Sequence, residues 1–255
     1  MNVYEESDGG PRAPPPSGGL DDLPLPDKAK AARGGCAHCA TRPLCLIGAL
    51  PQASAGIGPL VRERSFHAGE MLSREGDVAS HFRLIKIGTI FLCRNASEGA
   101  PRPVAVSGRG TAFGICSYVN LPNQVSVVAG SSGRYCEIAA ERIQSLARND
   151  KSFRARLEKI YVDTLGVLAS WAEAIGRGSI LARVAASLLL LADNQNSTAI
   201  TIPSHTALAE MLGTTRESVA RALATLEASE SVLRKSPRRC EIFPELLRER
   251  LVRTR

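Results

Sequence analysis

The pattern of apolar and polar positions changes three times along the chain. Residues 1–32 carry proline and glycine in place of core-forming residues, which is typical of a disordered tail. Between about residues 60 and 146, short apolar runs alternate with glycine turns, as in FHAGEMLSREGD and PVAVSGRGTAFG. Strands at such short, regular spacing predict a β-barrel or jelly-roll-like domain. Turns with a positive φ are expected at four of its glycines, Gly69, Gly76, Gly88 and Gly110.

After residue 149 the period becomes helical. Apolar residues recur at steps of three and four over 149–176, which predicts one helix of about seven turns with a single apolar stripe. The stripe can pack against its twin, as in a two-stranded coil, or against the β-domain of its own chain. We favour the first arrangement and predict a homodimer. The expected interface consists of Phe153, Leu157, Ile160, Thr164, Leu168, Trp171 and Ile175.

From residue 180 onward the pattern predicts a helix-turn-helix. Ser204 is a suitable N-cap for the helix HTALAEML, and Gly213 stands where the chain must reverse before RESVARALATLEAS. The start of such a second helix contacts base edges, where arginine recognises guanine and glutamate recognises cytosine. Glu217 has a second interpretation, because Thr214-x-x-Glu217 also fits a capping box. The expected DNA-reading residues are Arg216, Glu217, Ser218, Ala220 and Arg221.

A basic segment, LRKSPRRCEIF, follows the second helix. It predicts a hairpin wing whose cations face phosphates. Residues 216–255 hold ten Lys and Arg against six Asp and Glu, so much of the chain's net charge of +7 lies here. This distribution favours double-stranded DNA as the partner. The expected phosphate contacts are Arg234, Lys235, Arg238 and Arg239.

Together the patterns predict an α+β protein in four parts. We expect a tail over 1–32, a cysteine loop and β-roll sensor domain over 33–148, a dimerisation helix over 149–176, and a winged helix-turn-helix domain over 177–255. No run approaches the roughly 20 apolar residues of a membrane span, and no secretory signal opens the sequence. We therefore expect a cytoplasmic protein with no membrane partner. Its four histidines are scattered and no phosphate-cradling loop appears, which argues against an enzyme.

Three cysteines lie within ten residues in GGCAHCATRPLC, at Cys36, Cys39 and Cys45. Thiols stay reduced in the cytoplasm, and seven cysteines fit poorly with a complete disulfide framework. Four thiolates suit a [4Fe-4S] cluster, and they also suit zinc, although zinc sites more often show two C-x2-C pairs. An iron–sulfur cluster, a zinc site and a bare thiol switch therefore remain open on the residues alone.

The order of these segments resembles the CRP/FNR superfamily of bacterial transcription regulators over nearly the whole chain after the tail. FHAGEMLSREGDVASHFRLIKIGTI is similar to that family's β-roll, and TRESVARALATLE is similar to its recognition helix. The resemblance implies a DNA-binding homodimer on a palindromic site with TGA-containing half-sites, and RNA polymerase as a further partner. One departure is Glu230, which stands where a turn glycine is common in the family and predicts strain before the wing.

The cyclic-AMP branch of the family carries Gly-Glu-Leu, followed some ten residues later by an Arg-Ser pair that holds the cyclic phosphate. The matching stretch here is GICSYVNLPNQVSV, in which Ile115 and Val125 stand where the glutamate and the arginine should be. Losing the cation of a buried phosphate site would be costly. We therefore expect no cyclic-nucleotide binding.

The oxygen-sensing FNR branch carries C-x2-C-x5-C near its N-terminus and one distant cysteine, which together hold a [4Fe-4S] cluster. Cys36, Cys39 and Cys45 match the first three ligands. The distant ligand lies in a strand with the local sequence Cys-Glu-Ile, which RYCEIAAERI reproduces at Cys136. The resemblance thus implies a cluster on these four cysteines that senses oxygen or nitric oxide. The alternative is a regulator of the same family with a structural zinc or a thiol switch.

Three other cysteines are not needed in this assignment. Cys93 and Cys116 are expected to be small buried residues, and Cys240 lies in the wing of the other domain.

Overall fold

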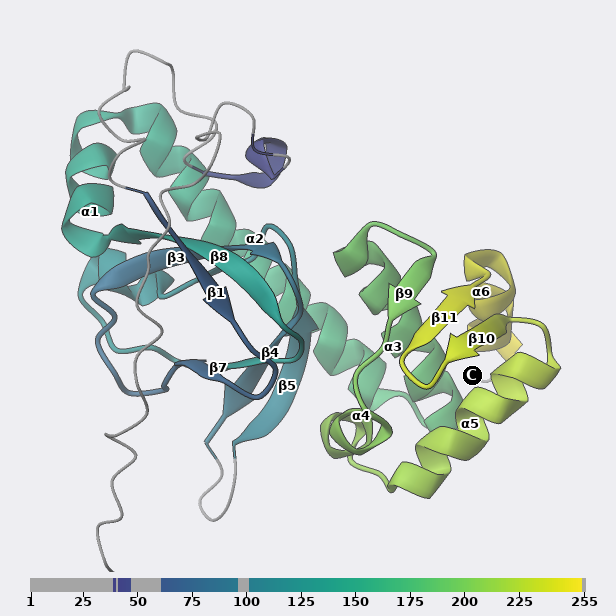
Figure 1. Cartoon of the computed structure of the whole chain (residues 1–255). Helices are drawn as coiled ribbons and strands as arrows, with labels where there is room; N and C mark the ends of the chain where they lie inside the picture. The colour runs from purple at the N-terminus through teal and green to yellow at the C-terminus, as the bar shows by residue number, and fades with distance from the viewer. Residues whose placement is uncertain (1–38, 40, 47–60, 96–100, 254–255) are drawn as a thin grey trace, which may run out of the picture.

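The computed structural model describes residues 39, 41–46, 61–95 and 101–253. The predicted tail over 1–32 and Cys36 lie outside the described residues. A β-rich body and a helical C-terminal body are joined by one long helix (Figure 1). No helix in the described part of the chain is long and apolar enough to cross a membrane.

The N-terminal body is a β-roll of two four-stranded antiparallel sheets, which confirms the predicted fold class. The first sheet has the order β1 (Arg62–Phe66), β8 (Gly133–Ala139), β3 (His81–Ile87), β6 (Ala112–Phe113). The second has the order β2 (Met71–Ser73), β7 (Ser126–Ala129), β4 (Ile90–Arg94), β5 (Arg102–Ser107). Their facing surfaces enclose a core that includes Phe66, Ile85 and Ile90.

Glycine turns connect these strands as the sequence predicts. All four expected glycines have a positive φ, from 87° to 107°. At Gly88, where φ is 107°, a Cβ atom would lie 2.9 Å from Cζ of Phe66 and 3.1 Å from Cα of Gly133. A side chain at Gly88 would therefore push into the core as well as strain the backbone.

Helices cover the outer face of the first sheet. α1 (Ala140–Asn149) leads into the 26-residue α2 (Lys151–Gly176), which is the long helix that the sequence predicts. Asp150 caps α2, since its carboxylate accepts hydrogen bonds from the backbone N–H groups of Ser152 at 2.8 Å and Phe153 at 3.0 Å. Two 3-10 helices, η3 (Arg42–Leu44) and η5 (Ile115–Val119), also belong to this body.

The most buried part of the α2 stripe packs on its own chain and not on a twin. Phe153 and Leu157 are 0% exposed and Trp171 is 1% exposed within a single protomer, so the prediction that these three form a dimer interface is wrong. The physical reason is that Phe153 and Leu157 cover the apolar outer face of the first sheet, whereas Trp171 packs in the other apolar cluster, next to β5. The other members of the stripe are half-buried: Ile160, Thr164, Leu168 and Ile175.

The opposite side of α2 carries a second stripe that the sequence analysis missed. Val162 and Leu165 are each 66% exposed, which is high for large apolar side chains. Three alanines and Glu158 continue the same face at steps of three and four. The exposed positions are Ala155, Glu158, Val162, Leu165, Ala169 and Ala172.

The C-terminal body is a winged helix-turn-helix. α3 (Ile180–Gln195) supports α4 (His205–Leu212) and α5 (Arg216–Ala228), and α6 (Pro244–Arg253) ends the described chain. A small sheet has the order β10 (Val232–Ser236), β11 (Arg239–Ile242), β9 (Ala199–Thr201).

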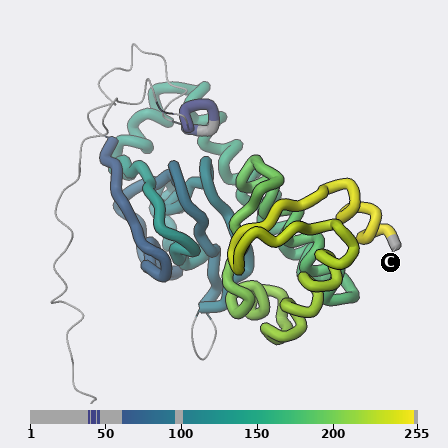
Figure 2. The backbone as a smooth tube through the Cα atoms, turned by 45° about the vertical axis from the view of Figure 1, so that its right-hand side comes forward, coloured from purple at the N-terminus to yellow at the C-terminus, as the bar shows by residue number. Residues whose placement is uncertain are grey.

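The two bodies touch at β5. The carbonyl of Val106 accepts hydrogen bonds from the indole N–H of Trp171 at 2.9 Å and from the side-chain amide of Asn194 at 3.0 Å. Helices α3 and α4 lie next to this strand, as Figures 1 and 2 show from two directions. One continuous apolar cluster therefore runs from the inside of the β-roll into the helix-turn-helix.

These packing assignments predict the effect of shortening Leu157. Leu157→Ala should lower the free energy of unfolding by about 2–5 kcal/mol, because the side chain is fully buried in the cluster beneath α2. Val78→Ala is the matched control, since Val78 is 63% exposed and should change stability by less than about 0.5 kcal/mol. Urea denaturation followed by circular dichroism measures both, and equal stabilities of the two variants would contradict the packing.

Candidate cysteine site and nucleic-acid interface

The described part of the cysteine segment forms one tight turn against the first sheet. The backbone N–H of Arg42 donates to the carbonyl of Cys39 at 2.9 Å, and that of Cys45 donates to the carbonyl of Arg42 at 3.1 Å. Pro43 lies in the first turn of η3, where its missing N–H costs nothing. Thr41 is 3% exposed and Leu46 is 4% exposed, so the turn is anchored on both sides.

Cys136 lies on the sheet face that this segment covers. In the register of the first sheet, Cys136 pairs with Glu63 on one side and with Leu84 on the other. Opposed residues on neighbouring antiparallel strands project from the same face, with Cβ atoms about 4.5–5.5 Å apart. Cys45 and Cys136 both pack against the apolar cluster that contains Leu84 and Leu46. Cys45 and Cys136 therefore pack against the same apolar cluster on this face of the sheet.

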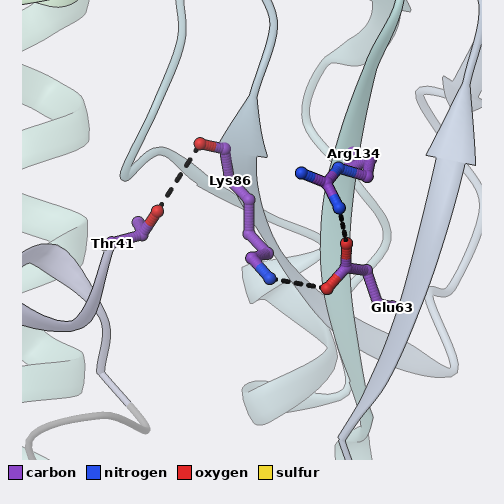
Figure 3. A network of polar contacts seen from close by, with 4 residues as sticks. All are labelled: Thr41, Glu63, Lys86 and Arg134. Atoms are coloured by element: carbon purple, nitrogen blue, oxygen red, sulfur yellow. Dashed lines mark hydrogen bonds and ion pairs between the residues drawn. The ribbon is translucent and has the colours of Figure 1, made fainter. Parts of the chain in front are cut away.

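Figure 3 shows an ion-pair network around Glu63 that the sequence analysis missed. Glu63 is the register partner of Cys136. The Glu63 carboxylate accepts from the ammonium of Lys86 at 2.5 Å through one oxygen and from the guanidinium of Arg134 at 2.7 Å through the other. The side chains of Lys86 and Glu63 are only 17% and 12% exposed. Thr41 of the cysteine segment donates to the backbone carbonyl of Lys86 at 3.5 Å. The network thus joins the segment to the strands around Cys136.

Lys86 is charged and lies within electrostatic range of two of the predicted ligands. Burial alone would lower the pKa of Lys86, but its hydrogen bond to Glu63 and negative charge at Cys136, Glu63 and Cys39 outweigh burial and raise that pKa. Cys39 and Cys136 therefore both act on the same ammonium group.

The remaining described cysteines, Cys93, Cys116 and Cys240, differ from the predicted ligands in burial or in position. Burial raises the pKa of Cys93 and of Cys240 to about 11, so both are protonated thiols in the core, and Cys93 is buried as predicted. Cys116, predicted to be buried, is half-buried in η5. None of the six described cysteines is in a disulfide.

The structure shows only part of the predicted ligand set. Because Cys36 lies outside the described residues, at most three of the four predicted ligands can be placed. Within the described ranges, no group of three or more His, Cys, Asp or Glu is arranged to hold a metal ion. The four-cysteine site therefore stays a prediction.

The segment that replaces the cyclic-phosphate motif is bonded to α2. The hydroxyl of Tyr161 donates to the carbonyl of Ile115 in η5 at 2.8 Å, and burial raises the pKa of Tyr161 to about 12. Gly114 precedes η5 with φ of 69°. The stretch 114–126 contains no lysine or arginine. A phosphate placed here would meet no cation from this stretch.

The helix-turn-helix has the caps that fix its geometry. Ser204 caps α4 as predicted, and its hydroxyl accepts from the N–H of Ala207 at 3.1 Å. Gly213 ends α4 with φ of 62°, the left-handed conformation that the sharp turn requires. Thr215 caps α5 by accepting from the N–H of Ser218 at 3.2 Å, so the alternative capping box from Thr214 does not form.

The predicted DNA-reading and phosphate residues lie on the recognition helix and the wing of this body. The exposed members are Arg216, Glu217, Arg221, Lys235, Arg238 and Arg239, and the half-buried members are Ser218, Ala220 and Arg234. Burial, Arg234 and Arg216 together lower the pKa of His205 at the start of α4. A cation of the wing and a cation of the recognition helix therefore both lie within electrostatic range of this residue.

Glu230 links recognition helix and wing in a strained conformation. Its φ is 57°, as expected for a position where glycine is favoured, and the strain costs about 1–2 kcal/mol. The backbone N–H of Ser231 donates to the carbonyl of Leu226 at 3.0 Å, which fixes the direction in which the wing leaves the helix.

Comparison with known proteins agrees with this geometry. The family model of the cyclic nucleotide-binding domain matches residues 63–150, and that of the Crp-like helix-turn-helix domain matches residues 182–249. A curated relative, "Probable transcriptional regulator flp" of Lacticaseibacillus casei, is 28% identical over 75% of this chain and 88% of its own length.

Two solved structures share the fold. FixK2 from Bradyrhizobium japonicum has a TM-score of 0.67 at 20% identity, over 74% of this chain and 96% of its own. A CRP-family transcriptional regulator from Thermus thermophilus has a TM-score of 0.61 at 17% identity, over 74% of this chain and 96% of its own.

The β-roll, the long helix and the winged helix-turn-helix define a two-domain DNA-binding regulator. Both the domains and the curated relative are those of transcriptional regulators rather than enzymes. The chain belongs to the CRP/FNR family of transcriptional regulators.

Base reading and phosphate binding are separable by mutation. Arg221→Ala should cost about 1–3 kcal/mol on a specific palindrome and relax specificity, because arginine on the recognition helix contacts a base edge. Lys235→Ala should weaken binding about equally on all DNA sequences and reduce the slope of log affinity against log salt concentration by about one. The reason is that the ion pair of Lys235 with Glu241 is exposed and weak, so Lys235 can bind a phosphate instead. Fluorescence anisotropy on specific and scrambled duplexes measures both. Arg94→Ala in the β-roll is the control, and identical effects of the first two variants would contradict the assignment.

Proposed function

We propose that this regulator senses oxygen or nitric oxide through a [4Fe-4S] cluster held by Cys36, Cys39, Cys45 and Cys136, and that the cluster controls dimerisation and DNA affinity. The observation that carries the proposal is the position of Cys136, which lies on the sheet face covered by the cysteine segment. When bound, the [4Fe-4S] cluster would supply iron and sulfide that react with oxygen or nitric oxide.

The described donors suit such a group. Thiolates are the usual ligands of a [4Fe-4S] cluster, and Cys39, Cys45 and Cys136 are half-buried and outside any disulfide. Half-burial leaves a path for a small gas molecule and excludes most of the bulk water. Cys93 and Cys240 do not suit it, because they are protonated and buried in the core.

The cysteine segment and α2 depend on the same packing. Leu46 of the segment and Phe153 and Leu157 of α2 belong to one apolar cluster over the first sheet. Ligation of Cys39 and Cys45 together with Cys136 would hold the segment against this cluster. Release would remove part of the support beneath α2. Binding of the iron–sulfur cluster would thus favour the state in which the segment is held over the state in which it is released, because the iron–sulfur cluster has a higher affinity for the held state.

A homodimer is proposed to form through the exposed stripe of α2 and not through the stripe first predicted. Val162 and Leu165 lie at its centre, with alanines that permit close approach on either side. In a two-fold dimer the same face meets itself, and two recognition helices would then be separated by about 34 Å, one turn of DNA. Such a dimer fits a palindrome, for which the family resemblance implies TGA-containing half-sites.

The contact at Val106 offers a route from sensor to DNA-binding domain. Trp171 near the end of α2 and Asn194 near the end of α3 donate to the same carbonyl. A change in α2 therefore alters the support of α3, against which the recognition helix packs.

Cyclic nucleotides are proposed not to be the effector, although the matched domain family is named for them. The reason is that the stretch 114–126 contains no lysine or arginine, while Tyr161 of α2 occupies the carbonyl of Ile115 within it. We also propose, from the family resemblance, that the DNA-bound dimer contacts RNA polymerase and that the protein acts in the cytoplasm, where thiols stay reduced.

The second candidate is a regulator of this family whose four thiolates hold structural zinc or act as a thiol switch. The donor set favours it as well, because the same thiolates suit a tetrahedral Zn²⁺ site. The two candidates differ in iron and acid-labile sulfide.

Metal and sulfide analysis of protein purified without oxygen separates these candidates. The proposal predicts a brown protein with iron and sulfide in equal amounts and little zinc. Cys136→Ala should lose the colour and the iron, because it removes a ligand, while Cys116→Ala should keep both. A colourless protein with stoichiometric zinc would contradict the cluster, and a brown Cys136→Ala protein would contradict the fourth ligand.

Leu165→Glu tests the dimer face. The substitution would place two carboxylates opposite each other across the two-fold axis, so the dimer dissociation constant should rise by at least about tenfold. Each protomer should remain folded, because Leu165 is 66% exposed. Analytical ultracentrifugation measures the constant. Val252→Glu, at a site 72% exposed on α6, is the control, and an unchanged dimer in Leu165→Glu would rule this face out.

A further inference from the structure

We propose that Ser218 is a positioning residue for DNA recognition: its hydroxyl group holds the guanidinium group of Arg221 toward the N-terminal end of the recognition helix, ready to contact a guanine. This inference rests on the base contact expected of Arg221 and needs no metal at the cysteine site. It changes the role that the sequence predicts for Ser218. The residue prepares the base contact of Arg221 and does not itself read a base.

A chain of hydrogen bonds connects the N-cap of α5 to Arg221. Thr215 accepts from the backbone N–H of Ser218 at 3.2 Å, and the hydroxyl of Thr215 donates to Oγ of Ser218 at 3.1 Å. The same Oγ accepts from the guanidinium group of Arg221 at 3.1 Å. The three residues follow one another at steps of three, so they are neighbours on one edge of the helix. The residue that fixes the start of α5 therefore also fixes the hydroxyl group that holds Arg221.

The bond to Ser218 sets the direction of the Arg221 side chain. Side chains of a helix lean toward its N-terminus, and Arg221 reaches back by about one turn to Ser218. The N-terminal end of a recognition helix is the part that contacts base edges in the major groove. Ser218 uses one N–H group of the guanidinium, and the other N–H groups remain available for O6 and N7 of a guanine.

Ser218 also keeps Arg221 from a competing partner. Glu217 precedes Arg221 by four positions, the spacing at which a glutamate and an arginine on one helix attract each other. Arg221 is instead bonded to Ser218, and the described ion pairs include none between Glu217 and Arg221. Without the hydroxyl group, Arg221 would be free to turn toward Glu217 or into water, and DNA binding would then have to order its side chain.

A role limited to helix stability makes a different prediction. The cap bond of Ser218 comes from its backbone N–H, which Ser218→Ala retains, and alanine is the better helix former. The variant should therefore be folded, and a loss of sequence preference would come from the hydroxyl group. A direct contact of Ser218 with DNA is distinguished by combining the variant with Arg221→Ala, because residues that act as a unit have non-additive effects.

The test is fluorescence anisotropy of the full-length protein, purified without oxygen, on a scrambled duplex and on the palindromic duplex that the wild type selects from a randomised library. Ser218→Ala should lower the ratio of the scrambled to the palindromic dissociation constant by about 2- to 10-fold per half-site, the cost of ordering one long side chain on binding. Ser218→Thr should restore most of the preference, because it keeps the hydroxyl group. In an Arg221→Ala background, Ser218→Ala should have no further effect.

Thr225→Ala is the matched control and should leave the ratio unchanged. Thr225 is exposed on the same helix, and its hydroxyl donates to the backbone carbonyl of Arg221 at 3.0 Å rather than contacting its guanidinium group. Circular dichroism verifies that each variant is folded.

Four results would overturn the inference. They are an unchanged ratio in Ser218→Ala, an equal loss in Thr225→Ala, effects of Ser218→Ala and Arg221→Ala that add in full, and a wild type without sequence preference. Failure of the proposed cluster is distinguished, because the variants differ from the wild type only in the recognition helix and the comparison among them does not depend on which metal the cysteines hold.

Discussion

The outer face of the first sheet is the constraint on which the rest of the structure depends. It is apolar at Leu84 and Phe82 and cannot be left in water. The first half of α2 and the cysteine segment cover it together, and they share one cluster. A change in how the segment is held therefore cannot be independent of the helix that joins the two domains. Packing therefore links the proposed sensing segment to the helix that carries the proposed dimer face.

The same helix faces three environments. Its buried side packs on the β-roll, its exposed side carries Val162 and Leu165, and its end reaches Val106 through Trp171. Asn194 brings α3 to the same carbonyl, and α3 supports the recognition helix. In this arrangement one helix contacts the cluster against which the cysteine segment packs, carries the proposed dimer face and reaches the DNA-binding domain.

Periodicity predicted the long helix, the helix-turn-helix and the wing, because each has a repeating pattern or a local cap such as Ser204. It gave the wrong partner for Phe153 and Leu157, since a period reveals which positions are buried and not what buries them. Cys136 was assigned through a family motif. The ion pair of Lys86 with Glu63 was not predicted, because it depends on strand register, and a single charged residue within a strand forms no recognisable sequence pattern.

The central claim is that the state of the cysteine site determines DNA affinity. The most direct measurement is the dissociation constant for a palindromic duplex, determined on one anaerobic sample before and after exposure to air, with the visible spectrum recorded in parallel. The account predicts that affinity falls as the absorbance disappears, and that Cys136→Ala is weak in both conditions. An unchanged dissociation constant while the colour is lost would contradict it.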